Sequence, residues 1–256
     1  MRIVALGAWL LVLSAVARAQ APVVAAASDL KFALEEIAAA WEAGGGSPLR
    51  LSFGSSGLLA SQIRQGAPYA LFLSADEAYV LALHREGRVP DAGVLYARGR
   101  IALVVPRGGA VSADPDLRGL AGALAAGRVR RFAIAHPGHA PYGQRAAEVL
   151  RHAGLWAVLE PHLVLGENVS QAAQFVASGA AEGGLVALSL LAAPGLRDRF
   201  DHAVVPEDWH RPLLQRMVLL RPEDPVAAGF FRFLQQPAAR RLLRRWGFQT
   251  PPQALP

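Results

Sequence analysis

The sequence predicts an α/β protein with two similar lobes, each built on a mostly parallel sheet that helices cover. Three observations lead to this fold class. Short buried strands alternate with amphipathic helices, which is the pattern of a parallel sheet with crossover helices. The unit of strand, polar turn and helix occurs in both halves of the chain. The length of 256 residues suits either one large domain or two lobes that interrupt each other.

The first half contains three strand-to-helix units. Buried strands are expected at 22–27, 49–53 and 70–73, each followed by a polar turn and a helical pattern. In the first helix, apolar side chains recur at helical spacing, and a run of glycines at 44–46 ends it. Ser74 and Glu77 have the spacing of a capping box, with a hydroxyl at the N-cap and a glutamate three residues later.

The second half repeats this order. Strands are expected at 101–105, 132–135, 163–165 and 184–188, and helices at 116–126, around 146–150 and at 169–178. After residue 194 the pattern changes. Strands at 203–205 and 214–220 precede two helices at 226–234 and 238–246, and a tail at 251–256 is expected to be disordered.

The N-terminus has the features of an export signal. Arg2 provides a positive charge, residues 3–16 are apolar, and Ala17-Arg18-Ala19 matches a cleavage site of small residues. The apolar run is too short for a good membrane span, and no later stretch is long enough. We therefore expect residues 1–19 to be removed near Ala19 and the mature protein to act, soluble, outside the cytoplasm. The chain has no cysteine, which excludes disulfides, thiolate metal sites and a lipidated cysteine.

The formal net charge is +6, and nearly all basic residues are arginines, with Lys31 as the only lysine. Four arginines gather at 240–245. Such a cluster is either a nucleic-acid patch or a solvated helix face. For an exported protein we favour the helix face and expect no nucleic-acid partner.

Residues 51–57 predict an anion site. An apolar strand enters the turn Gly54-Ser55-Ser56-Gly57, and a helix begins directly after it. Backbone N–H groups and hydroxyls then meet at the positive end of a helix dipole, without a lysine or arginine in the turn. Ser28 has an equivalent position after the first strand. The alternative is that Ser28 is only an N-cap and the second site only a turn.

Tyr142 and Val169 occupy similar strand-to-helix junctions in the second half. Ligands of open α/β sheets bind beyond the carboxyl ends of the strands. A cleft between the lobes would therefore bring Ser28, Ser56, Tyr142 and Val169 together.

Other motifs are weaker. Ser28 to Lys31 matches the S-x-x-K pattern of penicillin-binding enzymes, but the companion K-T-G would need a second lysine. The Gly54–Gly57 turn misses a nucleophile elbow by one position, and the absence of lysine there excludes a Walker A loop. His136 and His139 lie in a Pro/Gly loop and are expected to be surface or packing residues rather than metal ligands. A serine hydrolase that uses Ser28 or Ser56 with one of these histidines and Asp29 stays open, although no motif places them together.

Several segments resemble, in order and in spacing, the periplasmic molybdate-binding proteins of ABC importers. These segments are 25–30, 52–57, 62–63, 66–68, 71–76, 139–143, 166–172 and 184–188. The resemblance implies a type II periplasmic binding protein fold, with two α/β lobes joined by two crossover strands that act as a hinge. It places residues 20–98 plus 206–256 in lobe one and residues 99–205 in lobe two.

The resemblance also implies the function of a solute-binding module, not an enzyme, and no cofactor. Molybdate or tungstate would be held between the lobes and delivered to an inner-membrane ABC permease by a monomeric protein. Ser28 and Ser56 would each offer a hydroxyl and an N–H group, and Tyr142 and Val169 their backbone N–H groups. Asp29 would add a further contact. Sulfate or another oxyanion is the alternative ligand, and the export signal disfavours a regulatory oxyanion sensor.

Two positions depart from the pattern of the family. Ala187 stands where many relatives have a tyrosine hydroxyl, and Asp29 is a carboxylate where one branch of the family has an amide. A carboxylate that pointed at a dianion would repel it by several kcal/mol at low effective dielectric. We therefore expect Asp29 to offer at most its N–H group and to turn its side chain toward the helix start. A pocket of donors alone favours a fully deprotonated dianion over protonated phosphate.

Overall fold

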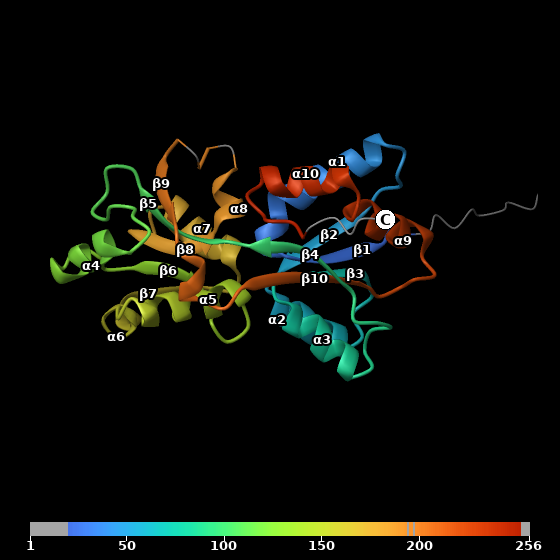
Figure 1. The fold of residues 1–256 in the computed structure, drawn as a ribbon, viewed down its shortest axis with the longest axis horizontal. Helices are drawn as coiled ribbons and strands as arrows, with labels where there is room; N and C mark the ends of the chain where they lie inside the picture. Colours follow the sequence, from blue (N-terminus) through green and yellow to red (C-terminus); the bar gives the residue numbers. More distant parts are fainter. Residues whose placement is uncertain (1–19, 194, 197, 252–256) are drawn as a thin grey trace, which may run out of the picture.

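Two five-stranded mixed sheets form the centres of two lobes (Figure 1). The computed structural model describes residues 20–193, 195–196 and 198–251. The expected export signal at 1–19 and all but the first residue of the expected disordered tail at 251–256 lie outside the described residues.

Lobe one is built on the sheet with the order β2-β1-β3-β10-β4. β1, β2 and β3 are parallel, whereas β10 runs antiparallel to both of its neighbours, β3 and β4. Its strands are β1 (Val23–Ala27), β2 (Arg50–Gly54), β3 (Tyr69–Ser74), β4 (Val94–Gly99) and β10 (Leu213–Leu219). Its helices are η1 (Ser28–Leu30), α1 (Lys31–Ala43), α2 (Ser56–Arg64), α3 (Glu77–Arg85), α9 (Pro225–Leu234) and α10 (Pro237–Arg245).

Lobe two is built on the sheet with the order β7-β6-β8-β5-β9. β6, β7 and β8 are parallel, and β5 runs antiparallel to β8 and β9. Its strands are β5 (Ile101–Pro106), β6 (Phe132–Ala135), β7 (Leu163–Gly166), β8 (Gly183–Ala187) and β9 (Phe200–Val204). Its helices are α4 (Arg118–Ala125), α5 (Pro141–His152), α6 (Trp156–Leu159), η2 (Glu160–His162), α7 (Val169–Ala177) and α8 (Leu188–Leu191).

Helices cover both faces of the first sheet. Side chains alternate along a strand, so neighbouring residues of β1 pack on opposite faces. On β1, Val24 and Ala26 pack in one apolar cluster with α1, α9 and α10, whereas Ala25 packs on the other face with α2 and α3. Figure 1 shows α1 and α10 on one side of this sheet and α2 and α3 on the other. Phe32 of α1 stacks on Trp246 after α10, with the ring centroids 5.8 Å apart.

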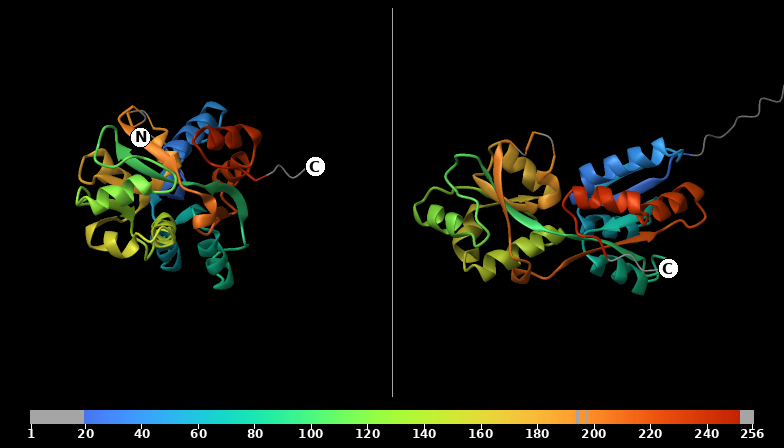
Figure 2. Two further views of the ribbon diagram at one scale, coloured as in Figure 1. Left: turned by 60° about the vertical axis from the view of Figure 1, so that its left-hand side comes forward. Right: turned by 45° about the horizontal axis from the view of Figure 1, so that its top comes forward.

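The chain passes twice between the lobes. β4 leads through Arg100 into β5, and β9 leads through η3 (Glu207–Trp209) into β10. Figure 2 shows these connections as the extended segments that join the two lobes. They agree with the expected fold of two lobes joined by crossover strands.

Most of the expected strands and helices are present, but some details differ. The strand β4 and the short helices α6 and α8 were not predicted. The crossover strands β5 and β10 pair antiparallel with their neighbours, a direction that the expectation of mostly parallel sheets left open. The predicted capping box was wrong. Asp76 is the N-cap of α3, and its carboxylate accepts from the N–H group of Ala78. The Ser74 hydroxyl instead donates to the carbonyl of Asp76. Ser74 still belongs to β3, and Glu77 pairs with Arg216 instead of capping the helix.

The parallel strands decide where a ligand can be bound. β1, β2 and β3 end next to the starts of η1, α2 and α3, and β6 and β7 end next to the starts of α5 and α7. These junctions are where the sequence predicts the anion site. Over the described ranges of the chain, we find no helix with both the length and the apolar character needed to cross a membrane.

Candidate anion-binding site

A small cavity lies between the two lobes, at the starts of η1, α2, α5 and α7. It is narrow, with about 10 Å³ available to the centre of a water-sized sphere. Four of the five residues expected to bind the anion line it, two from each lobe, and Asp29 lies behind it. The lining residues are Ala27, Ser28, Gly54, Ser55, Ser56, Ala75, Ala140, Pro141, Tyr142 and Val169.

Lobe one contributes two hydroxyl groups whose protons are free to donate. The Ser56 hydroxyl oxygen accepts a hydrogen bond from the N–H group of Ala75 at 2.9 Å. The Ser28 hydroxyl oxygen accepts from the N–H group of Ser170, which belongs to lobe two, at 3.3 Å. Because each oxygen already accepts from a backbone donor, its own proton is the group left for an anion. Ser28 is not a helix cap, since no side chain caps η1 or α1.

Ser55 has a different task from its neighbour Ser56. It is the N-cap of α2, with its hydroxyl oxygen 3.4 Å from the N–H group of Leu58. The same hydroxyl forms a 2.9 Å hydrogen bond with His139 Nδ1 of lobe two. Ser55 therefore has only a structural role, as a helix cap and a contact between the lobes. The Ser56 hydroxyl keeps its proton for a ligand in the cavity.

Lobe two contributes backbone N–H groups at two helix starts. Pro141 and Tyr142 are the first two residues of α5, and Val169 is the first residue of α7, where Asn168 is the N-cap. N–H groups in the first turn of a helix have no partner within the helix. The N–H groups of Tyr142 and Val169 therefore supply donors, and both helix dipoles place their positive ends here.

The cavity lining contains no acidic or basic side chain. Its polar groups are hydroxyl and amide donors from both lobes. A fully deprotonated tetrahedral oxyanion can accept from all of them, whereas an anion that keeps a proton would direct one donor at another donor. Ala187, at the end of β8, is buried and adds no hydroxyl.

Asp29 lies in the contact between the lobes, with its side chain buried and 1% of the residue exposed. Its Oδ2 accepts from the Tyr142 hydroxyl at 3.1 Å and from Gln215 Nε2 at 2.6 Å. Burial raises the pKa of this carboxyl to about 6, and the hydrogen bonds from Gln215 and Tyr142, together with the nearby backbone N–H groups of Asp29 and Leu30, offset part of the effect. The carboxylate thus faces the helix start and Tyr142, and the Tyr142 hydroxyl is used by Asp29.

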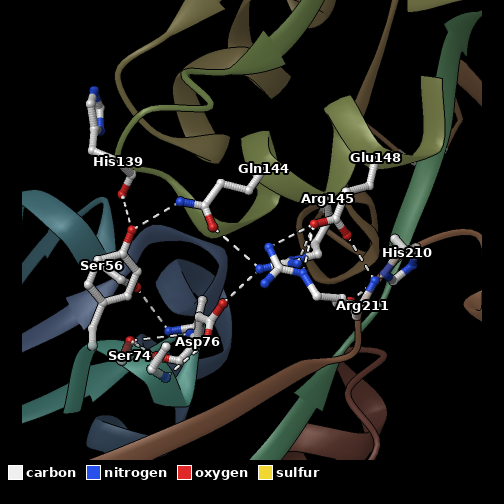
Figure 3. A network of polar contacts seen from close by, with 12 residues as sticks. Ser56, Ser74, Asp76, His139, Gln144, Arg145, Glu148, His210 and Arg211 are labelled. Atoms are coloured by element: carbon white, nitrogen blue, oxygen red, sulfur yellow. Dashed lines mark hydrogen bonds and ion pairs between the residues drawn. The ribbon is translucent and has the colours of Figure 1, made fainter. Parts of the chain in front are cut away.

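The lobes are closed on each other around the cavity. The N–H group of Gly57 donates to the carbonyl oxygen of His139 at 3.0 Å. Arg145 of α5, with 2% of its side chain exposed, forms ion pairs with Asp76 of lobe one at 2.9 Å and with Glu148 at 2.7 Å. Figure 3 shows Arg145 between these two carboxylates, with Gln144 and Arg211 beside them. On the other side of the cavity, the Ser170 hydroxyl donates to the carbonyl of Ser28 at 2.8 Å.

The two histidines that sequence patterns left open have structural partners. The rings of His136 and His139 stack with their centroids 4.7 Å apart, and His136 Nδ1 accepts from the N–H group of Gly138. Burial and the neighbouring His136 lower the pKa of His139. Within the described residues, no group of three or more histidine, aspartate or glutamate side chains could hold a metal ion. Because His139 bonds Ser55 and Asp29 bonds Tyr142 and Gln215, the arrangement required by the hydrolase alternative is not present.

The arginine cluster near the C-terminus makes contacts within the protein. Arg240 donates to the carbonyl of Pro251, Arg244 donates to the hydroxyl of Thr250, and Arg245 pairs with Glu36 of α1. These contacts are those of a helix face that packs against its surroundings.

Comparison with known proteins places this site in a family. The family model described as bacterial extracellular solute-binding protein matches residues 22–249. The chain belongs to this family of solute-binding proteins. It is 36% identical over 231 residues to the molybdate-binding protein ModA of Rhodobacter capsulatus, covering 89% of this chain and 88% of that protein. It is 34% identical over 249 residues to ModA of Azotobacter vinelandii, covering 96% of each chain.

The fold supports the same relationship. The solved structure of the periplasmic molybdate-binding protein of Azotobacter vinelandii has a TM-score of 0.82 and 30% sequence identity, covering 90% of this chain and 100% of that chain. The family and these relatives are binding proteins, which agrees with the expectation that this chain is not an enzyme.

Several contacts around the site were not predicted. The contacts of Gly57, Ser55 and Tyr79 with His139 join the lobes, as does the pair of Arg145 and Asp76. Gln215, which is fully buried, was also missed. A signal for it existed: it is an uncharged polar residue inside the apolar strand β10, and a buried amide needs a partner.

Proposed function

We propose that this protein captures molybdate or tungstate between its two lobes in the periplasm and delivers it to an ABC permease of the inner membrane. The observation that carries the proposal is the cavity between the lobes, where hydroxyl and N–H donors from both lobes converge without a charged side chain. The similarity to molybdate-binding relatives supports the choice of oxyanion.

The proposed contacts are hydrogen bonds to the oxygens of the anion. Ser28 and Ser56 donate from their hydroxyls and N–H groups, and Tyr142 and Val169 donate from their N–H groups. Asp29 contributes only its N–H group, because its carboxylate is bound to Tyr142 and Gln215. No cofactor is required.

Capture then follows from differential binding. We assign residues 20–98 plus 206–256 to lobe one and residues 99–205 to lobe two, with the crossovers as hinges. The anion first contacts one lobe, and donors of the other lobe stabilise the closed form. The protein acts as a monomer after cleavage near Ala19, and the closed form is recognised by the permease.

Calorimetric titration of the mature, anion-stripped protein tests the proposal. We expect tight one-to-one binding of molybdate and tungstate, with sulfate and phosphate much weaker. Binding of sulfate or phosphate without a response to molybdate would overturn the ligand assignment and leave the binding fold in place.

A further inference from the structure

Asp29 occupies an unusual position for a carboxylate. It directly follows Ser28, which lines the anion cavity, and it is buried between the lobes. Its Oδ2 accepts hydrogen bonds from Tyr142 of lobe two and from Gln215 of lobe one. Its Oδ1 is buried and has no hydrogen-bond partner within the described part of the chain. A dianion in the cavity would therefore lie close to a buried negative charge.

The groups that face Asp29 do not neutralise it. Tyr142 of α5 and Tyr96 of β4 are buried tyrosines whose pKa values burial raises well above the ordinary value, so both are neutral. Gln215 of β10 is uncharged, and Ser189 of α8 donates its hydroxyl to the backbone carbonyl of Asp29 at 2.7 Å. Among the described residues, the salt bridges formed do not include Asp29.

Lys31 of α1 is the nearest cation in the sequence, but its ammonium lies over the ring of Phe32, 5.6 Å from the centroid. It lines a neighbouring groove that shares Ser28 with the anion cavity and also contains Glu167. The charge of Asp29 is thus left without a cationic partner, in agreement with burial as the main cause of its raised pKa.

We propose that Asp29 couples anion capture to proton uptake, so that the cleft takes its dianion together with one proton carried on Asp29 Oδ1. The inference rests on the proposed function and adds a second solute, the proton, to the same site. Protonation removes the repulsion between the carboxylate and the dianion, which is strong where water is excluded. Because Oδ1 carries no hydrogen bond, the proton adds there while Oδ2 keeps its bonds to Tyr142 and Gln215.

The sign of the pH dependence follows from linkage. The dianion favours the protonated carboxyl, so the pKa of Asp29 is higher in the complex than in the free protein. Affinity therefore rises as the pH falls from the pKa of the complex to that of the free protein, by at most about tenfold per pH unit. With the anion absent, the closed structure has this pKa at about 6. In the open, ligand-free form Asp29 is less buried and its pKa lies nearer the ordinary value, so affinity should keep rising as the pH falls below about 6.

The test is calorimetry with molybdate from pH 8.5 to pH 5.5, at each pH in two buffers with different ionisation enthalpies. For the wild-type protein we expect uptake of close to one proton per anion near pH 7.5 and an affinity roughly tenfold tighter at pH 6.5 than at pH 7.5. Asp29→Asn keeps one oxygen acceptor for Tyr142 and Gln215 and removes the charge. It should bind molybdate more tightly than wild type at pH 8, without proton uptake and with a flat profile.

Asp116→Asn is the matched control, because Asp116 is a partly exposed acid that pairs with Arg118. It should keep the wild-type slope. Wild-type binding of molybdate without proton uptake would overturn the inference and leave the proposed function standing. A slope retained in Asp29→Asn would also overturn it, by assigning the proton to another group. Failure to bind molybdate at any pH would overturn both proposals. The wild-type proton count decides the question even if the variant does not fold.

Discussion

The two lobes approach the same cavity with different chemistry. Besides backbone N–H groups, lobe one presents the hydroxyls of Ser28 and Ser56, which are side-chain donors. Lobe two presents the N–H groups of Tyr142 and Val169, which are backbone donors at the starts of α5 and α7. A side-chain donor is lost by one substitution, whereas a backbone donor survives every substitution except proline. The loss of affinity on substitution should therefore depend on whether a donor belongs to the side chain or to the backbone, and not only on how strongly that donor binds the anion.

The largest effect is expected from Ser56→Ala. The variant loses a hydroxyl donor to the anion and leaves the buried N–H group of Ala75 without its acceptor. A hydrogen bond to a charged group contributes about 1.5–3 kcal/mol, so affinity for molybdate should fall roughly 10- to 150-fold. Calorimetric titration measures the change.

Ser61→Ala is the control for Ser56→Ala, because Ser61 lies on the same helix and its exposed hydroxyl only accepts from Gln65. It should bind as wild type does. Equal affinity of Ser56→Ala and Ser61→Ala would show that the lobe-one hydroxyl does not hold the anion.

The next largest effect is expected from Val169→Pro, which removes a backbone N–H donor of lobe two. Val169 is the first residue of α7, a position that proline tolerates well because its N–H group has no partner in the helix. Asn168 before it is already extended, with φ −144° and ψ 174°, as a residue before proline requires. The variant therefore removes the N–H group with little change to the helix, and affinity should fall about 10- to 30-fold.

Titration combined with thermal unfolding checks Val169→Pro. We expect a melting temperature close to that of wild type. Unchanged affinity in a folded variant would mean that this N–H group does not contact the anion.

A smaller loss, about tenfold, is expected from Gly57→Ala, which separates the lobes without touching a donor. A Cβ atom at Gly57 would lie 2.5 Å from the carbonyl oxygen of His139, too close for the closed lobes. The anion should dissociate faster, which stopped-flow fluorescence can follow. Gly122→Ala in α4 is the control, since a Cβ atom there meets nothing within 4 Å. If Gly57→Ala keeps the wild-type dissociation rate, closure at His139 does not retain the ligand.

The same contrast explains what could be predicted from the sequence. The serine donors of lobe one could be predicted, because Ser28 and Ser56 lie in a recognisable order of strand, turn and helix. Local features also gave most of the strands. β4 was missed because only Val94 in it is β-branched, so its sequence has a weak strand pattern. The cap of α3 was misplaced by two residues, because Ser74 and Asp76 are both good caps and only the end of β3 decides between them.

Contacts between the lobes could not be predicted. His139 and Ser55 are 84 residues apart, and Asp29 and Tyr142 are 113 apart. Which residues meet depends on how the two sheets are oriented when the lobes close, and periodicity within a segment carries no information about that. Charge alone indicates that the Asp29 carboxylate should not point at the anion, but no pattern in the sequence indicates that Tyr142 and Gln215 bind the carboxylate.

The smallest effect is expected from Val169→Ala, the partner of the proline variant. Its side chain is 4% exposed and packs in the core of lobe two, so truncation should lower the free energy of unfolding by about 1–3 kcal/mol. The N–H group stays in place, and affinity should change by no more than about twofold, because the backbone donor does not depend on the side chain. Chemical denaturation and titration together separate the two quantities. An affinity loss as large as that of Val169→Pro would mean that the side chain positions the donor, and the distinction between the two lobes would then fail.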